Sequence, residues 1–488
     1  MSRSLPAQLI ARFNRAPQFI RGALLLAALL LVLAVLVTGC AGVWPPPDGG
    51  ESRESSESHD HYDAAGRGDT GSGLERGELP GDVPFIRVGL AHGIRDAVVS
   101  CRGGFTVGLY ADSLESWRAE AGEKWRFGAG GGGVTGSGSG GGFHMDAGTI
   151  RIRPEAARPG EAGPLVFDGV AYRGEIELFS SGRGSLTVVN VVDLESYLRG
   201  VVPREIGTRP ESEIEAVKAQ AIAARTYAIA AGGRRAAGGF DVYATVDDQV
   251  YAGVDGEDPV CDRAILATAG VFMSHSGEPI HAYFHANCGG RTEARHEVWE
   301  LPRVPYLTQV WDSPEEDQFN DAFCSGGAHF RWSETWTGKE IADLVKKHLP
   351  GAASTPVRKP LGEVLNLRVT VNTPSGRVRW LEVETEGATY RVFGDRVRWL
   401  LRRPGTDQIL WSSWFELDVT TLRGGRVVRV DAEGRGYGHG IGLCQHGAME
   451  MARQGYRYDG ILKHYYAGVS LESAYGEGAA APSGSEGL

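Results

Sequence analysis

The sequence predicts an α+β fold with a β-rich core, a few helices and two lobes that flank a cleft. Short runs of β-branched and aromatic residues, bounded by Gly and polar clusters, recur along residues 84–192. A long helical pattern follows in residues 208–231, and two alternating strands around a turn at 372–376 predict a hairpin in 364–385. With 488 residues, the chain is long enough to bury two or three cores.

Residues 1–39 are predicted to be a lipoprotein signal peptide. Four arginines precede the continuous apolar run Ala23–Val37, and Val37-Thr38-Gly39-Cys40 resembles a bacterial lipobox, in which Cys40 would be lipidated. The alternative is an uncleaved anchor, but the apolar run is short of the about 20 residues that a membrane-spanning helix needs. In either case the body of the chain is expected outside the cytoplasm.

Composition divides the remaining chain into a tether, a body and a tail. Residues 40–82 are rich in Gly, Ser, Glu, Asp and Pro and are predicted to form a disordered tether, and residues 476–488 a disordered tail. Between them, residues 83–475 are interpreted as one domain. Its segment 128–142 is almost all Gly and Ser, which predicts a mobile surface loop. The net charge of −11 argues against a nucleic-acid partner, which would favour a basic surface.

The clearest helical pattern lies around residues 208–231. Apolar residues recur at steps of three and four and make one stripe: Ile214, Val217, Ala221, Ala224 and Ala228. Thr208 and Glu211 have the spacing of a capping box, with Pro210 in the first turn. Gly232 and Gly233 can end the helix in a left-handed conformation.

Glu205 precedes this helix and is interpreted as lying outside it. Pro203 stiffens the approach, and a stiff loop at a helix start is a good mount for a catalytic group. The alternative is a solvated carboxylate that complements the helix dipole. The dipole at a helix N-terminus would favour ionised Glu205, whereas burial by Val201, Val202 and Ile206 would raise its pKa. We expect burial to prevail.

Six segments, in order, resemble the stage II sporulation protein D family, which includes the amidase enhancers. They are VVDLESYLRGVVPREI (191–206), EAVKAQAIAARTYAIA (215–230), DQVYAG (248–253), YFHANCGGRTE (283–293), HFRW (329–332) and GRGYGHGIGLCQHGAMEMA (434–452). The resemblance covers most of residues 85–471. It implies a lytic transglycosylase acting on peptidoglycan glycan strands, with Glu205 as the catalytic residue.

A single carboxylate suffices for this reaction. It protonates the glycosidic oxygen and then takes a proton from the sugar's own 6-hydroxyl, which attacks the anomeric carbon and leaves a 1,6-anhydro ring. Hydrolytic glycosidases usually need two acidic groups. Gln249 and Tyr251 are interpreted either as sugar-binding residues or as a polar strand edge with a packed tyrosine. His439 is interpreted either as lining the cleft near Glu205 or as a hydrogen-bonded loop histidine. The full predicted substrate-binding set is Arg204, Lys218, Gln220, Arg225, Tyr227, Gln249, Tyr251, Tyr283, His439 and Gln445.

Histidines and cysteines gather in residues 280–299 and beyond. His281, His285, Cys288 and Cys324 could hold structural zinc, and some members of the resembled family bind zinc near this region. The competing interpretation is a Cys288–Cys324 disulfide. Cys444 stands where many relatives carry Ser, and its role as a metal ligand is doubtful. Cys101 and Cys261 are either a second pair or buried thiols.

These features lead to three functional hypotheses. The first is a peptidoglycan lytic transglycosylase that cleaves between N-acetylmuramic acid and N-acetylglucosamine and needs no cofactor for its chemistry. The second is a non-catalytic, glycan-binding enhancer of a cell-wall amidase, and the third is a zinc hydrolase that uses the His and Cys cluster. The expected location is the bacterial envelope, with glycan strands and the membrane as partners.

Overall fold

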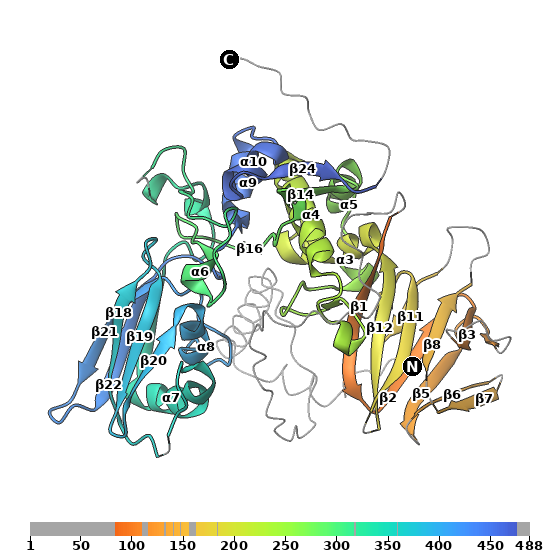
Figure 1. The fold of residues 1–488 in the computed structure, drawn as a ribbon, viewed down its shortest axis with the longest axis horizontal. Coiled ribbons are helices and arrows are strands. Elements are labelled where there is room, and N and C mark those ends of the chain that lie inside the picture. Colours follow the sequence, from red (N-terminus) through yellow and green to blue (C-terminus); the bar gives the residue numbers. More distant parts are fainter. Residues whose placement is uncertain are drawn as a thin grey trace, which may run out of the picture. The chain divides into compact units, whose positions relative to one another are not determined.

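The structure is a computed structural model that describes residues 83–475, except 110–115, 131–132, 140, 147, 156–162, 183, 317–318 and 359. The predicted signal peptide, the lipidation site Cys40, the tether and the tail therefore lie outside the described residues. The described part is α+β and rich in strands, as predicted (Figure 1). Within it, no helix has both the length and the apolar character needed to cross a membrane.

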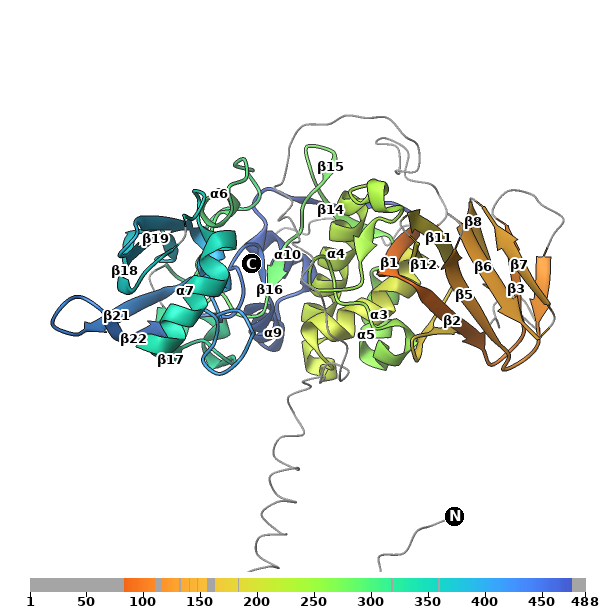
Figure 2. The same cartoon turned by 90° about the horizontal axis from the view of Figure 1, so that it is seen from below.

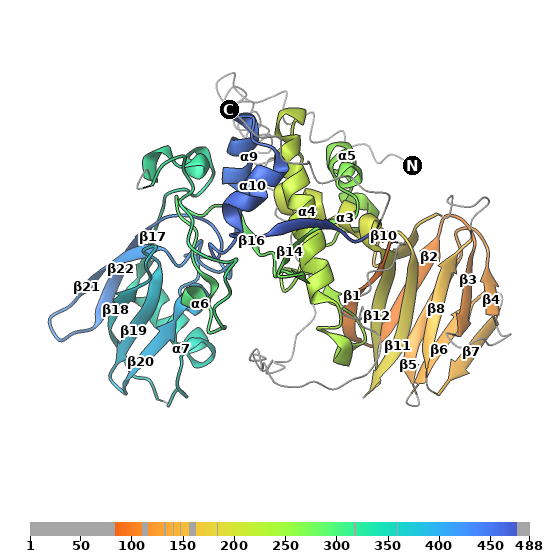
Figure 3. The same ribbon diagram turned by 45° about the horizontal axis from the view of Figure 1, so that its top comes forward.

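The first half of the described chain forms two antiparallel sheets with one added parallel strand. The larger sheet has the order β13-β1-β12-β11-β8-β3-β4, and the smaller has the order β10-β9-β2-β5-β6-β7 (Figures 1 and 3). The strands are β1 (Phe85–Ile94), β2 (Asp96–Cys101), β3 (Phe105–Leu109), β4 (Ser116–Ala119), β5 (Lys124–Gly130), β6 (Gly133–Gly138), β7 (Gly141–Met145), β8 (Thr149–Pro154), β9 (Leu165–Phe167), β10 (Val170–Tyr172), β11 (Glu175–Gly182), β12 (Ser185–Asp193) and β13 (Val242–Tyr243).

The predicted loop at 128–142 is wrong for the described residues of this segment. β5, β6 and β7 pair as successive antiparallel strands, with Phe127 opposite Gly136 and Gly136 opposite Phe143. Glycine occurs at these positions because neighbouring aromatic rings fill the space that a side chain would need. A Cβ at Gly136 would lie 2.4 Å from the Phe143 ring, and one at Gly138 would lie 2.2 Å from the Trp125 indole nitrogen.

Helices occupy the middle and the end of the described chain. They are α3 (Leu194–Ile206), α4 (Ile214–Ala231), α5 (Pro259–Ala267), α6 (Arg295–Val298), α7 (Gly338–Ala352), α8 (Val397–Leu400), α9 (Gln445–Arg453) and α10 (Tyr458–Tyr465). α4 packs against α3, α5, α9 and α10, so it lies at the centre of this group (Figures 1 and 2). The predicted capping box is not formed, because α4 begins only after a short 3₁₀ turn, Glu211–Glu213, and has no side-chain cap.

The remaining strands form small sheets. Among the described residues, three are three-stranded, with the orders β15-β14-β24, β17-β22-β21 and β18-β19-β20 (Figure 3), and β16 pairs with β23. Their bounds are β14 (Val271–His275), β15 (Glu278–Pro279), β16 (Phe284–His285), β17 (Trp332–Thr337), β18 (Val364–Asn372), β19 (Val378–Thr385), β20 (Thr389–Phe393), β21 (Phe415–Thr421), β22 (Val427–Gly434), β23 (Leu443–Cys444) and β24 (Ser470–Ser473). β18 and β19 are the predicted hairpin.

The buried apolar residues form two clusters. The larger includes residues from Ile86 to Phe330 and from Ile441 to Tyr475. The smaller cluster is formed by residues from Trp332 to Ala432, and it packs α7 and α8 against the sheets β17-β22-β21 and β18-β19-β20. The predicted cleft between two lobes stays a prediction.

Candidate functional site

Glu205 lies in the last turn of α3, so the prediction that it precedes a helix in a non-helical segment is wrong. Helix α3 continues through Pro203, although proline removes a backbone hydrogen bond and disfavours helix before it. Packing outweighs this cost because the apolar side chains of α3 are buried, namely Leu194, Tyr197, Leu198, Val201, Val202 and Ile206. The helix begins at Asp193, whose carboxylate accepts a hydrogen bond from the Ser196 amide, and ends at Gly207, where φ is 76°.

The surroundings of Glu205 favour its protonated form. Burial raises the pKa of Glu205 from its ordinary value of 4.5 to about 7, and a hydrogen bond from the Val250 amide (3.0 Å) opposes the shift. The C-terminal end of a helix disfavours an anion, so the helix dipole acts in the same direction as burial. Among the described residues, no second charged group contributes to this shift. Burial prevails, as expected, and Glu205 can both donate and accept a proton near neutral pH.

This shift predicts that Glu205→Gln changes stability in a pH-dependent way. Because the folded-state pKa is above the ordinary value, the folded protein holds the proton more tightly than the unfolded chain does. That stabilisation is fully present below about pH 4.5 and is lost as the pH rises through about 7. Glu205→Gln, which stays neutral, should therefore match the wild type in free energy of unfolding at about pH 4 and exceed it at about pH 8. Urea denaturation across this range measures the difference.

Glu384→Gln is the matched control for that experiment, because Glu384 is exposed on β19. Its difference from the wild type should not depend on pH in this range. A wild type that gains stability relative to Glu205→Gln as the pH rises would contradict the assigned environment of Glu205.

Gln249 and Tyr251 support Glu205 from inside the protein, so their predicted contact with sugar is wrong. Gln249 is 1% exposed, accepts a hydrogen bond from the Tyr197 hydroxyl (3.2 Å) and donates one to the Ala224 carbonyl (3.5 Å). Tyr251 is 6% exposed and donates to the Asn190 side chain (2.9 Å). These bonds fix the chain on both sides of Val250, whose amide bonds Glu205.

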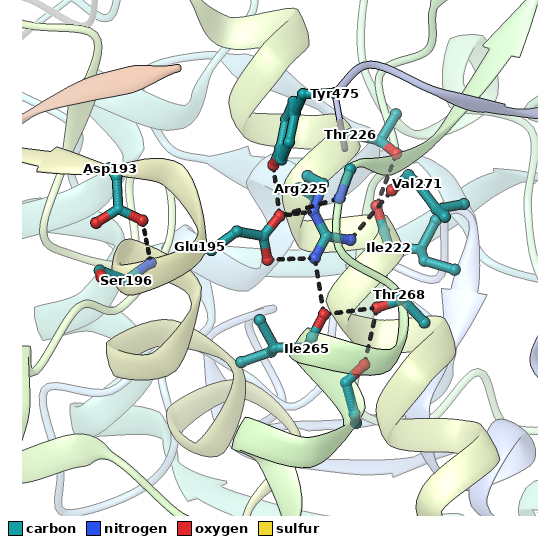
Figure 4. A network of polar contacts seen from close by, with 12 residues as sticks. Asp193, Glu195, Ser196, Ile222, Arg225, Thr226, Ile265, Thr268, Val271 and Tyr475 are labelled. Carbon is teal, nitrogen blue, oxygen red and sulfur yellow. Dashed lines mark hydrogen bonds and ion pairs between the residues drawn. The ribbon is translucent and has the colours of Figure 1, made fainter. Parts of the chain in front are cut away.

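Arg225 is also internal, and the predicted substrate contact is wrong for this residue. Its guanidinium is fully buried and forms two hydrogen bonds to the Glu195 carboxylate (2.8 and 2.7 Å) and one to the Val271 carbonyl (3.1 Å) (Figure 4). The Tyr475 hydroxyl and the Gly270 amide donate to the same carboxylate. The pair therefore ties α3 to α4 and to the start of β14.

The other predicted residues on α4 also hold the helix in place. Gln220 is fully buried and accepts a hydrogen bond from Gln445 of α9 (3.3 Å), so neither is available to a substrate without rearrangement. Tyr227 is buried and donates to the Asp248 carboxylate (3.0 Å). The Lys218 ammonium is 2.6 Å from a Glu215 oxygen.

The remaining predicted substrate-binding residues are Arg204, Tyr283 and His439. Arg204 is exposed beside Glu205 in the last turn of α3. The Tyr283 ring lies 6.0 Å from that of Tyr227 and 6.3 Å from that of His439. Burial, and after it the charges of Glu205 and Tyr227, raise the pKa of Tyr197. That His439 lies near Glu205 stays a prediction.

Three buried thiols and a carboxylate form a candidate metal centre. The ligand atoms of Cys288, Asp312, Cys324 and Cys444 all lie within 4.8 Å of one another. The predicted ligands Cys288 and Cys324 belong to this cluster, whereas His281 does not and instead stacks near Tyr283. Asp312 is a candidate ligand that the sequence interpretation missed, and Cys444 is one that it considered but did not include in the predicted set. A signal was available for Cys444, which lies in a Gly-rich segment beside two histidines.

His285 lies at the edge of this cluster. Its Nδ1 is 3.2 Å from the Ile441 carbonyl, which accepts a hydrogen bond from the Nδ1–H tautomer and leaves Nε2 with a lone pair. Nε2 is buried and has no hydrogen-bond partner among the described residues. Burial raises the pKa of Cys444, but the two other thiols and His285 lower it further, with a net decrease.

The donor set fits zinc. A zinc ion about 2.3 Å from each sulfur places two sulfurs of a tetrahedron roughly 3.8 Å apart, and those of Cys288 and Cys324 are 3.5 Å apart. A disulfide would need about 2.05 Å, and all five described cysteines are free thiols, including Cys101 and Cys261. Burial also raises the pKa of Asp312 to about 8, a cost that a bound dication would remove.

Comparison with known proteins shows what this chain is similar to. Residues 182–275, which include Glu205 and Arg225, match the SpoIID family model, described as stage II sporulation protein. Residues 293–442 match a domain of unknown function. Residues 182–275 are therefore similar to the stage II sporulation protein family, which confirms the resemblance seen in the sequence.

Individual relatives agree with this assignment. The chain is 28% identical over 310 residues to an uncharacterized protein of Brachyspira hyodysenteriae, covering 63% of this chain and 74% of that protein. It is 27% identical to stage II sporulation protein D of Bacillus subtilis, covering 59% of this chain and 76% of the relative. The similarity to the Bacillus subtilis amidase enhancer is 28% identity over 67% of this chain, which spans about half (47%) of the enhancer's length.

Proposed function

We propose that the chain is a peptidoglycan lytic transglycosylase with Glu205 as its single acid and base. The observation that carries this proposal is the half-buried Glu205 side chain, whose carboxyl has a pKa raised by burial to about 7 and so keeps a substantial protonated fraction at neutral pH. Its position within the SpoIID match and the names of the relatives support a cell-wall substrate. We propose an extracytoplasmic, membrane-anchored location on the same basis and on the lipobox-like sequence.

The proposed reaction cleaves the bond from N-acetylmuramic acid to N-acetylglucosamine. Protonated Glu205 gives its proton to the glycosidic oxygen as the bond from the muramic acid C1 to that oxygen breaks. The Glu205 carboxylate then takes the proton of the muramic acid 6-hydroxyl while O6 bonds to C1. The products are a 1,6-anhydro end and a free 4-hydroxyl, and Glu205 is again protonated. Purified peptidoglycan digested with the protein and analysed by mass spectrometry tests this proposal.

A second candidate function is a glycan-binding enhancer of a cell-wall amidase, because one relative is named amidase enhancer. A mixture of this chain with an amidase distinguishes the two functions. If Glu205→Gln stimulates the amidase as well as the wild type does and neither protein releases glycan fragments alone, the enhancer function holds.

We further propose that Cys288, Cys324 and Cys444 hold a structural zinc ion, with Asp312 or His285 as the fourth ligand. Such an ion would join β16, β23 and the segment around Cys324. Metal analysis of the purified protein should find one zinc per chain, and Cys444→Ala should lose it. Chelation should lower the melting temperature of the wild type but not that of Cys444→Ala. Cys101→Ala, a buried thiol outside the cluster, is the control.

Glycan cleavage should persist in zinc-depleted protein that remains folded, because Glu205 supplies the acid and base. Loss of cleavage at unchanged folding would instead favour the zinc hydrolase hypothesis. Metal-free protein with a full complement of free thiols and an unchanged melting temperature would contradict the zinc site.

A further inference from the structure

The structure has a polar groove far in sequence from Glu205. A cavity of about 990 Å³ lies between the sheet β17-β22-β21 and strand β18 and falls within the matched domain of unknown function. Its volume is at the upper end of the range for small-molecule sites. Its lining includes Arg331, Asn366, Trp414, Glu416, Glu433 and Arg435, and none of the residues predicted from sequence to bind substrate or metal.

Arg435 brings a positive charge to this groove without a direct ion pair among the described residues. Its guanidinium makes no hydrogen bond or ion pair with any residue that the structure describes, and it contacts the rings of Phe319 (5.3 Å) and Trp414 (5.8 Å). Burial and the neighbouring charge of Arg331 lower the pKa of Arg435, and the charge of Glu416 opposes this shift. Arg331 is exposed and bonds only the Asn320 amide oxygen. Two adjacent guanidiniums of this kind favour a carboxylate, which they bind through paired hydrogen bonds.

Glycine alternation explains how Arg435 comes to lie here. In the segment 434–440, Arg435, Tyr437 and His439 alternate with glycines. A Cβ at Gly434 would lie 2.2 Å from the Trp332 ring, and one at Gly436, where φ is 81°, would lie 2.8 Å from the Asn287 carbonyl. The backbone at these glycines therefore packs directly against its neighbours, and the side chains of the alternating residues point away from these contacts. Arg435 reaches the groove, while His439 lies beside the rings of Tyr283 and Trp299.

Two carboxylates provide the opposite charge in the same groove. Glu416 on β21 and Glu433 on β22 are directly opposite each other in the antiparallel register, so they share a face of the sheet. Like charges at such positions repel each other. Both are exposed, and among the described residues neither carboxylate has a hydrogen bond or an ion pair. An ammonium group between them would relieve the repulsion.

We propose that this groove binds a zwitterionic peptide, with a carboxylate on Arg331 and Arg435 and an ammonium group near Glu416 and Glu433. Asn366, which lines the groove, supplies an amide that can bond a peptide group, and Trp414 forms an apolar wall. A ligand with carboxylates alone would leave the two glutamates uncompensated. The stem tripeptide L-alanyl-γ-D-glutamyl-meso-diaminopimelate carries both charges and occurs with the proposed substrate.

Calorimetric titration with this free tripeptide tests the proposal. We expect saturable binding that Arg435→Gln and Glu433→Gln each weaken by about tenfold or more, since each removes a charged hydrogen-bond partner. Acetylation of the peptide amines should weaken binding to the wild type but add little loss in Glu433→Gln. Arg423→Gln and Glu384→Gln, at exposed positions outside the groove, should bind as the wild type does.

Three outcomes would overturn the proposal. They are no binding of the tripeptide, equal binding of its N-acetylated form, and binding of peptide-free glycan that depends on Arg435 but not on Glu433. Glu433 is exposed, so its variant reports on the groove even if Arg435→Gln fails to fold. Glu205→Gln should bind the tripeptide unchanged, which separates failure of this groove from failure of the proposed function.

Discussion

Glu205→Gln should abolish glycan cleavage while the protein stays folded. The glutamine oxygen can still accept the hydrogen bond from the Val250 amide, and the side chain keeps its size within the last turn of α3. It cannot give a proton to the glycosidic oxygen or take one from the 6-hydroxyl. General acid–base catalysis typically contributes about 10²–10⁴-fold to a rate, and we expect a loss of at least that range. The initial rate of fragment release from purified peptidoglycan measures it.

Glu384→Gln makes the same chemical change on the surface of β19 and should release fragments at the wild-type rate. Urea denaturation of both variants separates loss of chemistry from loss of folding. Fragment release by folded Glu205→Gln at close to the wild-type rate would show that another group is the acid.

Arg225→Met should destabilise the folded protein by about 3–5 kcal/mol, the usual cost of removing one member of a buried ion pair. Arg225 is fully buried, and its loss leaves the Glu195 carboxylate without its cation. The Tyr475 hydroxyl and the Gly270 amide bond the same carboxylate, so the effect should extend to the contacts of α3 with β14 and β24. The free energy of unfolding in urea at neutral pH measures this effect.

Two further variants make the interpretation specific. Arg225→Met combined with Glu195→Gln should recover part of the lost stability, because the uncompensated charge is gone. Lys339→Met removes an exposed ion pair with Asp343 and should change the stability far less than Arg225→Met does. If Arg225→Met is as stable as the wild type but has a raised KM for glycan, Arg225 contacts substrate, as the sequence interpretation assumed.

Elements set by local patterns could be predicted from the sequence. The helical stripe from Ile214 to Ala228 lies in α4, and Gly233, with φ of 73°, provides the left-handed stop. The hairpin of β18 and β19 was predicted from alternation and a turn. In these cases the residues that determine the conformation are neighbours in the chain.

Elements decided by distant contacts could not be predicted in this way. Pro203 indicated a break, but burial of Val201, Val202 and Ile206 keeps α3 helical up to Glu205. The glycines of β6 indicated a loop, but the rings of Trp125 and Phe143 fill the space that side chains would need. Arg225 and Gln249 have residue types common in binding sites, and only the fold shows that they are internal.

The candidate metal centre could likewise be predicted only in part from the sequence. Cys288 and Cys324 are near each other in sequence, whereas Cys444 joins them only because β16 and β23 pair with His285 opposite Cys444. Asp312 lies in a segment without a recognisable metal motif. Local spacing therefore identified two of the cluster's residues and wrongly added His281.

Digestion of purified peptidoglycan in ¹⁸O-labelled water, followed by mass spectrometry of the released glycans, tests the central claim most directly. If Glu205 serves in turn as acid and base for attack by the sugar's own 6-hydroxyl, the new ends are 1,6-anhydro-muramic acid without ¹⁸O. They are lighter than a hydrolysed end by one water and are absent with Glu205→Gln. New reducing ends that contain ¹⁸O would show that water is the nucleophile and would contradict the account.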